Sequence, residues 1–244
     1  MLEHIFYAQF GEDKILYHLF GKKNIGACVE VGGYDGITGS NTYFFEKTGW
    51  KCLILEPIPE LCEKIKLNRN CDILQVAASD KKGFSDFYIA KGAETLSTIE
   101  TEKEHFDRIH QDGGTDIEQI KVKTDLLTNI LIHQGYNEID FLTLDVEGHE
   151  ISALRGLDFK KINIKILIIE DATFGKSNNV KNFMKANSYI RFKRTGCNDW
   201  YAKKGSDFFN IFTVFLIELE IFFILQLKKI KSVIKKMILK IPLI

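Results

Sequence analysis

Short runs of apolar residues recur along the chain, separated by segments in which apolar residues follow a helical spacing. The runs at 27–31, 51–55, 73–78, 141–144 and 164–169 are typical of buried strands. Helices are predicted at 13–20, 60–67, 126–134 and 150–154. Because parallel neighbours need crossover connections, this alternation predicts an α/β fold: a doubly wound, mostly parallel sheet with helices on both faces.

One stretch breaks the rhythm. Residues 91–120 are mostly polar and contain the pair Gly113-Gly114, which favours an excursion or lid with some helix near 100–110. It falls between the third and fourth predicted strands, so we expect it to cover the ligand pocket. Ligands of such sheets bind beyond the carboxyl ends of the strands.

The predicted strands end in glycines or acids. Glycines follow Val31, and Glu56, Asp145 and the pair Glu170-Asp171 each follow a later strand. Since the carboxyl ends of parallel strands meet at one edge of a sheet, these carboxylates are expected along a common rim.

The segment from Val29 to Gly36 joins a strand to a turn whose glycines, Gly32, Gly33 and Gly36, allow close approach of a ligand. Glu30 stands at the strand end, and Glu56 occupies the position from which an acid accepts hydrogen bonds from both ribose hydroxyls of an adenosine. Together they predict an adenosine site. The alternative is a tight turn with both acids facing water.

A nicotinamide-dependent oxidoreductase is the natural rival. Its GxGxxG fingerprint holds a pyrophosphate at a helix N-terminus, and the glycines here do not match that spacing. Asp35 would also place negative charge beside a pyrophosphate. Loops rich in acids favour a cation, and S-adenosylmethionine carries a sulfonium and an ammonium but no phosphate.

A second cluster follows the strand at 141–144, where Asp145, Glu147, His149 and Glu150 surround Gly148. Asp145 and Glu147 are expected over the adenosine site, and His149 is a candidate base for a hydroxyl proton. The alternative makes Glu147 a helix N-terminal acid and His149 a surface or capping residue.

Asp145, Glu170 and Asp171 also offer hard oxygen ligands at neighbouring strand ends, a set appropriate to Mg²⁺. The alternative is that Asp171 caps the following segment and Glu170 pairs with a lysine.

Composition narrows the class of protein. With 244 residues, 45% of them hydrophobic, we expect one domain over 1–205 with an appendage over 206–244. Acidic and basic residues balance at 33 each, so the average charge gives no reason to expect a nucleic acid partner. Five cysteines without a CxxC pair favour reduced thiols in the cytoplasm, and no export signal is visible at the N-terminus.

The appendage is predicted to meet a membrane. Residues 208–227 are intensely apolar, but Glu218 and Glu220 near their middle disfavour a spanning helix. Beyond them, isoleucines recur at helical spacing opposite lysines, which predicts a basic amphipathic helix on an anionic cytoplasmic surface. The alternatives are packing on the domain, packing on a second subunit of a homo-oligomer, and a true spanning segment.

Over residues 5–204 the sequence resembles the FkbM family of methyltransferases. The matching segments, in the same order, are Ala8–Asp13, Val29–Gly36, Ser40–Tyr43, Glu56-Pro57, Asp145–Glu150 and Asp199-Trp200. The resemblance implies a class I, Rossmann-like methyltransferase fold with a seven-stranded sheet, S-adenosylmethionine as donor, and O-methylation of a hydroxyl on a sugar, polyketide or related natural product. Combined with the predicted membrane-binding appendage, it favours a glycan or glycolipid hydroxyl. A catalytically silent membrane-bound scaffold is the alternative that keeps the fold.

Carried over by position, the resemblance assigns donor-binding roles. Its donor residues here are Glu30, Gly32, Gly33, Asp35, Gly36, Asn41, Glu56, Pro57, Ala78, Ser79 and Asp145. Asp145 would lie beside the transferred methyl group. Many relatives have a small residue followed by Asn in the first loop, where this chain has Gly33 and Tyr34.

Overall fold

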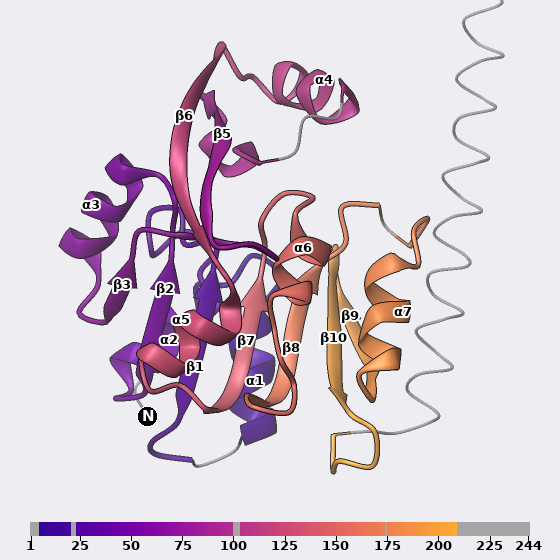
Figure 1. The fold of residues 1–244 in the computed structure, drawn as a ribbon. Helices are drawn as coiled ribbons and strands as arrows, with labels where there is room; N and C mark the ends of the chain where they lie inside the picture. The colour runs from indigo at the N-terminus through magenta and orange to yellow at the C-terminus, as the bar shows by residue number, and fades with distance from the viewer. Residues whose placement is uncertain (1–4, 21–22, 100–102, 174, 209–244) are drawn as a thin grey trace, which may run out of the picture.

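The computed structural model of the chain describes residues 5–20, 23–99, 103–173 and 175–208 (Figure 1). Its larger sheet has seven strands in the order β3-β2-β1-β7-β8-β10-β9. Their bounds are β1 Ala27–Val31, β2 Lys51–Leu55, β3 Asp72–Leu74, β7 Glu138–Leu144, β8 Asn163–Glu170, β9 Tyr189–Thr195 and β10 Asn198–Lys203. The strand β10 runs opposite to the other six, which all point the same way.

Helices cover both faces of this sheet, which confirms the predicted doubly wound architecture (Figure 1). They are α1 Glu12–Phe20, α2 Tyr43–Lys47, α3 Pro59–Asn68, α5 Leu127–His133, α6 Glu150–Arg155 and α7 Asn179–Ala186. The chain order reverses between β1 and β7, which lie side by side although more than a hundred residues separate them. This reversal creates the topological switch point at which such sheets bind ligands.

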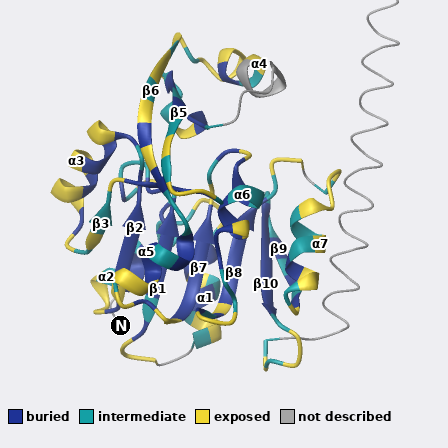
Figure 2. Cartoon of the chain, viewed as in Figure 1, coloured by how far each residue is buried: buried dark blue, intermediate teal, exposed yellow. Residues whose placement is uncertain are grey.

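The central strands are buried on both faces (Figure 2). Along β1, Val29 and Val31 belong to one apolar cluster with Leu127 and Leu154, while Cys28 belongs to another on the opposite face with Phe141. Successive side chains of a strand point to opposite faces, so a strand covered on both sides reads as a continuous apolar run.

A smaller sheet stands above the larger one (Figure 1). It has the order β4-β6-β5, with β4 Ala77–Ala78, β5 Gly83–Lys91 and β6 Asp116–Asp125. Between β5 and β6 lie the short 3₁₀ helix η1 Glu94–Leu96 and the helix α4 Lys103–Gln111. We call residues 83–125 the arm.

The arm corrects two sequence interpretations. The apolar run at 73–78 is not one strand, because Ile73 and Leu74 belong to β3 whereas Ala77 and Ala78 pair with β6. The excursion predicted at 91–120 carries the predicted helix, but it is the far end of two long antiparallel strands, because β5 ends at Lys91 and β6 begins at Asp116. These strands escaped prediction because few of their side chains are buried.

Within the described residues, none of the helices is both long enough and apolar enough to cross a bilayer. The predicted amphipathic segment falls in residues 209–244, outside the described residues.

Candidate active site

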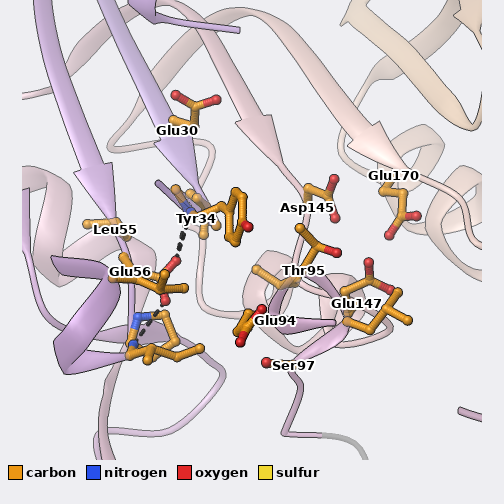
Figure 3. Close-up of a pocket in the computed structure, with 18 of the residues that line it drawn as sticks. Glu30, Tyr34, Leu55, Glu56, Glu94, Thr95, Ser97, Asp145, Glu147 and Glu170 are labelled. Atoms are coloured by element: carbon orange, nitrogen blue, oxygen red, sulfur yellow. Dashed lines mark hydrogen bonds between the residues drawn. The ribbon is translucent and has the colours of Figure 1, made fainter. Parts of the chain in front are cut away.

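A cavity of about 780 Å³ lies beyond the carboxyl ends of β1, β2, β7 and β8, at the switch point of the sheet (Figure 3). The first loop and the end of β2 form one side, and the ends of β7 and β8 form the other. The arm closes it from above through residues of η1 and its flanks, with Arg108 of α4. This cavity collects the strand-end residues that the sequence singled out.

Gly32 sets the closest approach between the two central strands. Its φ is +91°, and a Cβ atom there would lie 1.9 Å from the carbonyl oxygen of Asp145. The loops after β1 and β7 are also joined by a hydrogen bond of 3.0 Å from the Asp145 N–H to the Val31 carbonyl. Only glycine satisfies both the backbone conformation and the available space.

Glu56 organises the first loop from the end of β2. Its carboxylate accepts hydrogen bonds from the N–H groups of Gly33 at 3.2 Å and Tyr34 at 3.0 Å, and from Ile58 at 2.9 Å. Tyr34 has a φ of +48°, a conformation that asparagine tolerates better than tyrosine. Burial raises the pKa of Glu56 to about 7, although the hydrogen bonds from the loop oppose that shift.

Glu30, at the end of β1, is fully engaged by the segment that follows the first loop. It accepts hydrogen bonds from the hydroxyls of Ser40 at 2.7 Å and Thr42 at 2.5 Å, and from the N–H of Asn41 at 2.9 Å. The side-chain Oδ1 of Asn41 is buried and has no hydrogen-bond partner in the structure. This unpaired acceptor belongs to a residue of the cavity wall.

Arg69, at the end of α3, holds the same segment from behind. Its guanidinium lies 3.8 Å from the Glu30 carboxylate, donates to the Gly36 carbonyl at 2.7 Å and to the Thr42 hydroxyl at 3.0 Å, and pairs with Glu46. The Arg69 side chain is completely buried. It compensates the buried charge of Glu30 and positions the loop without touching the cavity.

Three carboxylates meet on the other side of the cavity, and we call Asp145, Glu147 and Glu170 the acidic cluster (Figure 3). One oxygen from each lies within 4.8 Å of the others. Burial and the negative charge of Asp145 raise the pKa of Glu147 to about 8 and that of Glu170 to about 10. Both glutamates therefore hold a proton more tightly than an ordinary carboxyl group, because three acids share one site.

His149 lies beside this cluster. Its Nε2 is 3.2 Å from the hydroxyl of Ser79, and both side chains are buried. Glu150 accepts hydrogen bonds from the N–H groups of Val146 at 3.2 Å and Gly148 at 3.1 Å. These contacts fix the loop that carries Glu147, whose φ of +50° is rare outside glycine.

Sequence comparison now identifies the family. The profile of the methyltransferase FkbM domain matches residues 30–194. The chain belongs to the FkbM methyltransferase family. The matched segment contains all four strand ends that border the cavity.

No curated protein matches this FkbM methyltransferase significantly. Among solved structures, it is similar to a SAM-dependent methyltransferase from Aquifex aeolicus, with 13% identity and a TM-score of 0.41 over 79% of this chain and 89% of that one. A TehB-like SAM-dependent methyltransferase from Corynebacterium glutamicum has 8% identity and a TM-score of 0.41 over 80% and 89% of the two chains. The family assignment therefore rests on the sequence profile, and the fold on the strand order.

The FkbM chain brings most of the predicted site residues to one cavity. Those on its wall are Glu30, Gly32, Gly33, Asn41, Glu56, Pro57, Ala78, Asp145, Glu147, His149 and Glu170. Ser79 stands behind His149 and holds its ring. Four strand ends thus converge as the parallel arrangement predicted.

Besides Ser79, three predicted residues do not line the cavity. Asp35 accepts hydrogen bonds from the N–H groups of Ile37 and Thr38 and closes a turn. Gly36 packs against Arg69, and a Cβ atom on Gly36 would lie 2.9 Å from Cγ of Arg69. Asp171 pairs with Arg194 at 2.8 Å and accepts the Gly175 N–H, so Glu147 takes the place in the acidic cluster that the sequence suggested for Asp171.

Two cationic residues escaped the sequence analysis. Arg69 ends a helix and Arg108 lies in the arm, both far from any strand end in sequence. No local pattern distinguishes them from surface arginines. Ser40 and Thr42, by contrast, fall within a segment that carries the family resemblance.

Proposed function

We propose that this protein transfers a methyl group from S-adenosylmethionine to a hydroxyl oxygen of a sugar, glycan, glycolipid or related natural product. The observation that carries the proposal is the shared cavity: Glu30, Gly32, Glu56 and Asp145 come from three strands and all line it. Family membership supports methyl transfer. The acceptor class is supported by the family resemblance and, for a glycan or glycolipid, by the sequence of the C-terminal segment.

The residues at the tips of β1 and β2 fit the donor. Glu56 presents a buried carboxylate to the cavity with capacity to accept hydrogen bonds from ribose hydroxyls. Asn41 supplies a buried oxygen that lacks a donor. The main chain of Gly32 and Gly33 borders the cavity, and the surrounding carboxylates favour a positively charged ligand over a phosphate.

When bound, S-adenosylmethionine supplies a methyl group on a sulfonium, whose carbon–sulfur bond breaks with the electron pair staying on sulfur as the acceptor oxygen bonds to carbon. The protein must align that oxygen and remove its proton. In this proposal His149 takes the proton, with Ser79 orienting its ring, and Asp145 positions the reacting groups.

Calorimetry with S-adenosylhomocysteine and with NAD tests the donor. We expect S-adenosylhomocysteine to bind the native chain and Glu60→Gln, an exposed acid of α3, with the same affinity, and Glu56→Ala to weaken binding at least tenfold. NAD should not bind. Binding of NAD in its place would indicate an oxidoreductase, and binding of neither ligand would indicate a silent scaffold.

The acceptor atom requires a separate test. Incubation with S-adenosylmethionine carrying a ¹³C-methyl group and a panel of glycans and glycolipids should give products whose methyl carbon has the NMR shift of a methyl ether. Methyl-amine products alone would contradict O-methylation. His149→Gln should lower kcat by about 10²–10⁴-fold, as expected for loss of a general base, and leave donor affinity unchanged.

We also propose that the C-terminal segment attaches the protein to an anionic membrane surface. The support is its sequence, which sets Ile230, Val233 and Ile234 against lysines at helical spacing. The full chain should sediment with vesicles containing phosphatidylglycerol and less with phosphatidylcholine alone. Changing Lys228, Lys229, Lys231, Lys235 and Lys236 to Glu should abolish this. The same change at Lys64, Lys81, Lys82, Lys121 and Lys123 keeps the net charge equal and should not.

A further inference from the structure

The acidic cluster has the geometry of a cation site. One carboxylate oxygen each from Asp145, Glu147 and Glu170 lies within 4.8 Å of the other two. A hard divalent cation binds carboxylate oxygens at about 2.0–2.6 Å. Two oxygens bound to the same ion can therefore be separated by at most twice that distance, and the oxygens of the acidic cluster meet this condition. Three oxygens this close can share an ion with little movement.

Glu170 provides a second, independent observation at this cluster. Glu170 is only 6% exposed, yet its side-chain atom Oε2 has no hydrogen-bond partner in the structure. Figure 3 shows the Glu170 carboxylate turned toward those of Asp145 and Glu147. Buried carboxylate oxygens are costly unless they are paired or bound to a metal.

One cationic side chain faces this cluster in the described part of the chain. Arg108 pairs with Glu147 at 3.0 Å, and the Arg108 side chain is 42% exposed. Asp171, the neighbour of Glu170, is already neutralised by Arg194. One half-exposed guanidinium thus meets three carboxyl groups, and a divalent cation bound among them would hold all three in the ionised form.

We propose that Asp145, Glu147 and Glu170 bind a divalent cation of the Mg²⁺ or Mn²⁺ type on the acceptor side of the cavity. Carboxylate oxygens are suited to hard cations such as these, whereas Zn²⁺ sites commonly use thiolate or histidine ligands. The cluster lies at the ends of β7 and β8, whereas the donor-binding residues Glu30 and Glu56 lie at the ends of β1 and β2. In this proposal the ion and the adenosyl group occupy different parts of one cavity.

The inference deepens the proposed function and rests on it for its chemical role. An ion at this place would bind the acceptor hydroxyl directly and lower its pKa, which makes the oxygen a better nucleophile at neutral pH. The acceptor proton still leaves to His149. The acceptor is thus an oxygen compound, since an amine nitrogen is a poorer ligand for a hard cation.

Mn²⁺ binding to the full chain tests the site without any turnover. Electron paramagnetic resonance titration should show one Mn²⁺ bound per chain, and Mg²⁺ should displace it. Glu170→Gln and Glu147→Gln should each weaken Mn²⁺ at least tenfold. Asp171→Asn is the matched control, because it removes a carboxylate next to Glu170 that faces Arg194, and it should bind Mn²⁺ as the native chain does. Thermal unfolding of each variant checks that the fold is intact.

Two results would overturn the site. Equal Mn²⁺ affinity in the native chain and Glu170→Gln would show that the cluster is not the ligand set. Loss of Mn²⁺ on saturation with S-adenosylhomocysteine would show that the acids serve the donor instead. S-adenosylhomocysteine binding in EDTA is measured alongside: if it persists while Mn²⁺ fails to bind, the metal inference falls and the proposed donor stands.

Discussion

The guanidinium of Arg108 lies 3.0 Å from the carboxylate of Glu147 and so joins the arm to the acidic cluster. A second link is close by, where the Thr98 hydroxyl donates a hydrogen bond of 2.8 Å to the main-chain carbonyl of Glu147. Both contacts end on the residue with the left-handed backbone. The position of the arm and the conformation of this loop are therefore coupled.

Replacing Arg108 by Gln tests whether this contact serves the acceptor side. Because the ion pair is half exposed, its loss should change the free energy of unfolding by less than about 1 kcal/mol. We expect the KM for the acceptor to rise and the affinity for S-adenosylhomocysteine to stay constant. Asp112→Asn is the control, since it removes the other partner of Arg108, 3.6 Å away, and spares Glu147. A selective loss of donor affinity would contradict this assignment.

The sequence was sufficient for the parts of the site that lie directly after strands. Buried parallel strands read as uninterrupted apolar runs, so the ends at Val31, Leu55 and Leu144 were found at the residue where the structure has them. The glycines and acids that follow these strand ends were therefore expected at one edge of the sheet. The number of strands, seven, came only through the family resemblance, and the strand order comes from the structure.

Contacts formed by residues far apart in sequence were beyond that reasoning. Nothing local to Arg69 indicates that it neutralises Glu30, because the pairing depends on how α3 packs behind the first loop. The same holds for the presence of Glu147 in the acidic cluster in place of Asp171. Glu147 has a left-handed backbone, and Asp171 pairs with Arg194 instead. Side-chain direction at a strand end is a tertiary property.

Gly32→Ala and Gly49→Ala separate steric crowding from backbone strain. The two glycines have similar φ angles, +91° and +94°, but a Cβ atom at Gly32 meets the Asp145 carbonyl at 1.9 Å whereas at Gly49 nothing lies within 4 Å. Gly49→Ala should lose about 1–2 kcal/mol of stability from the backbone alone. Gly32→Ala should lose clearly more and should also lose donor binding. Urea unfolding and calorimetry measure both, and equal losses would mean that the loops separate easily.

Arg69→Met removes a buried cation and leaves Glu30 uncompensated. Breaking a buried ion pair from one side costs about 3–5 kcal/mol, so we expect a loss of that order in the free energy of unfolding. Donor affinity should fall as well, because Arg69 holds the segment of Gly36 and Thr42. Lys66→Met breaks an exposed pair with Glu63 on the same helix and should cost well under 1 kcal/mol. Similar losses of stability in the two variants would mean that the buried ion pair of Arg69 contributes no more than an exposed one.

Glu56 predicts how the protein responds to pH. Its pKa in the folded protein is raised to about 7 by burial, above the ordinary value of 4.5, so the protonated form is favoured in the fold. The stability that this residue contributes is fully present below pH 4.5 and is lost as the pH rises through about 7. Unfolding free energies should therefore fall over this range in the native chain relative to Glu56→Gln, which does not titrate.

Donor binding should follow the opposite course. Ribose hydroxyls donate hydrogen bonds, so the ionised carboxylate of Glu56 is the better acceptor. With a pKa of about 7, the ionised fraction rises roughly tenfold between pH 6 and pH 8, and the affinity for S-adenosylhomocysteine should rise by up to that factor. In Glu56→Gln this contribution should vanish, whereas any contribution from the acidic cluster stays in both proteins and cancels in the comparison. An affinity that changes equally with pH in the two proteins would mean that Glu56 does not hold the ribose.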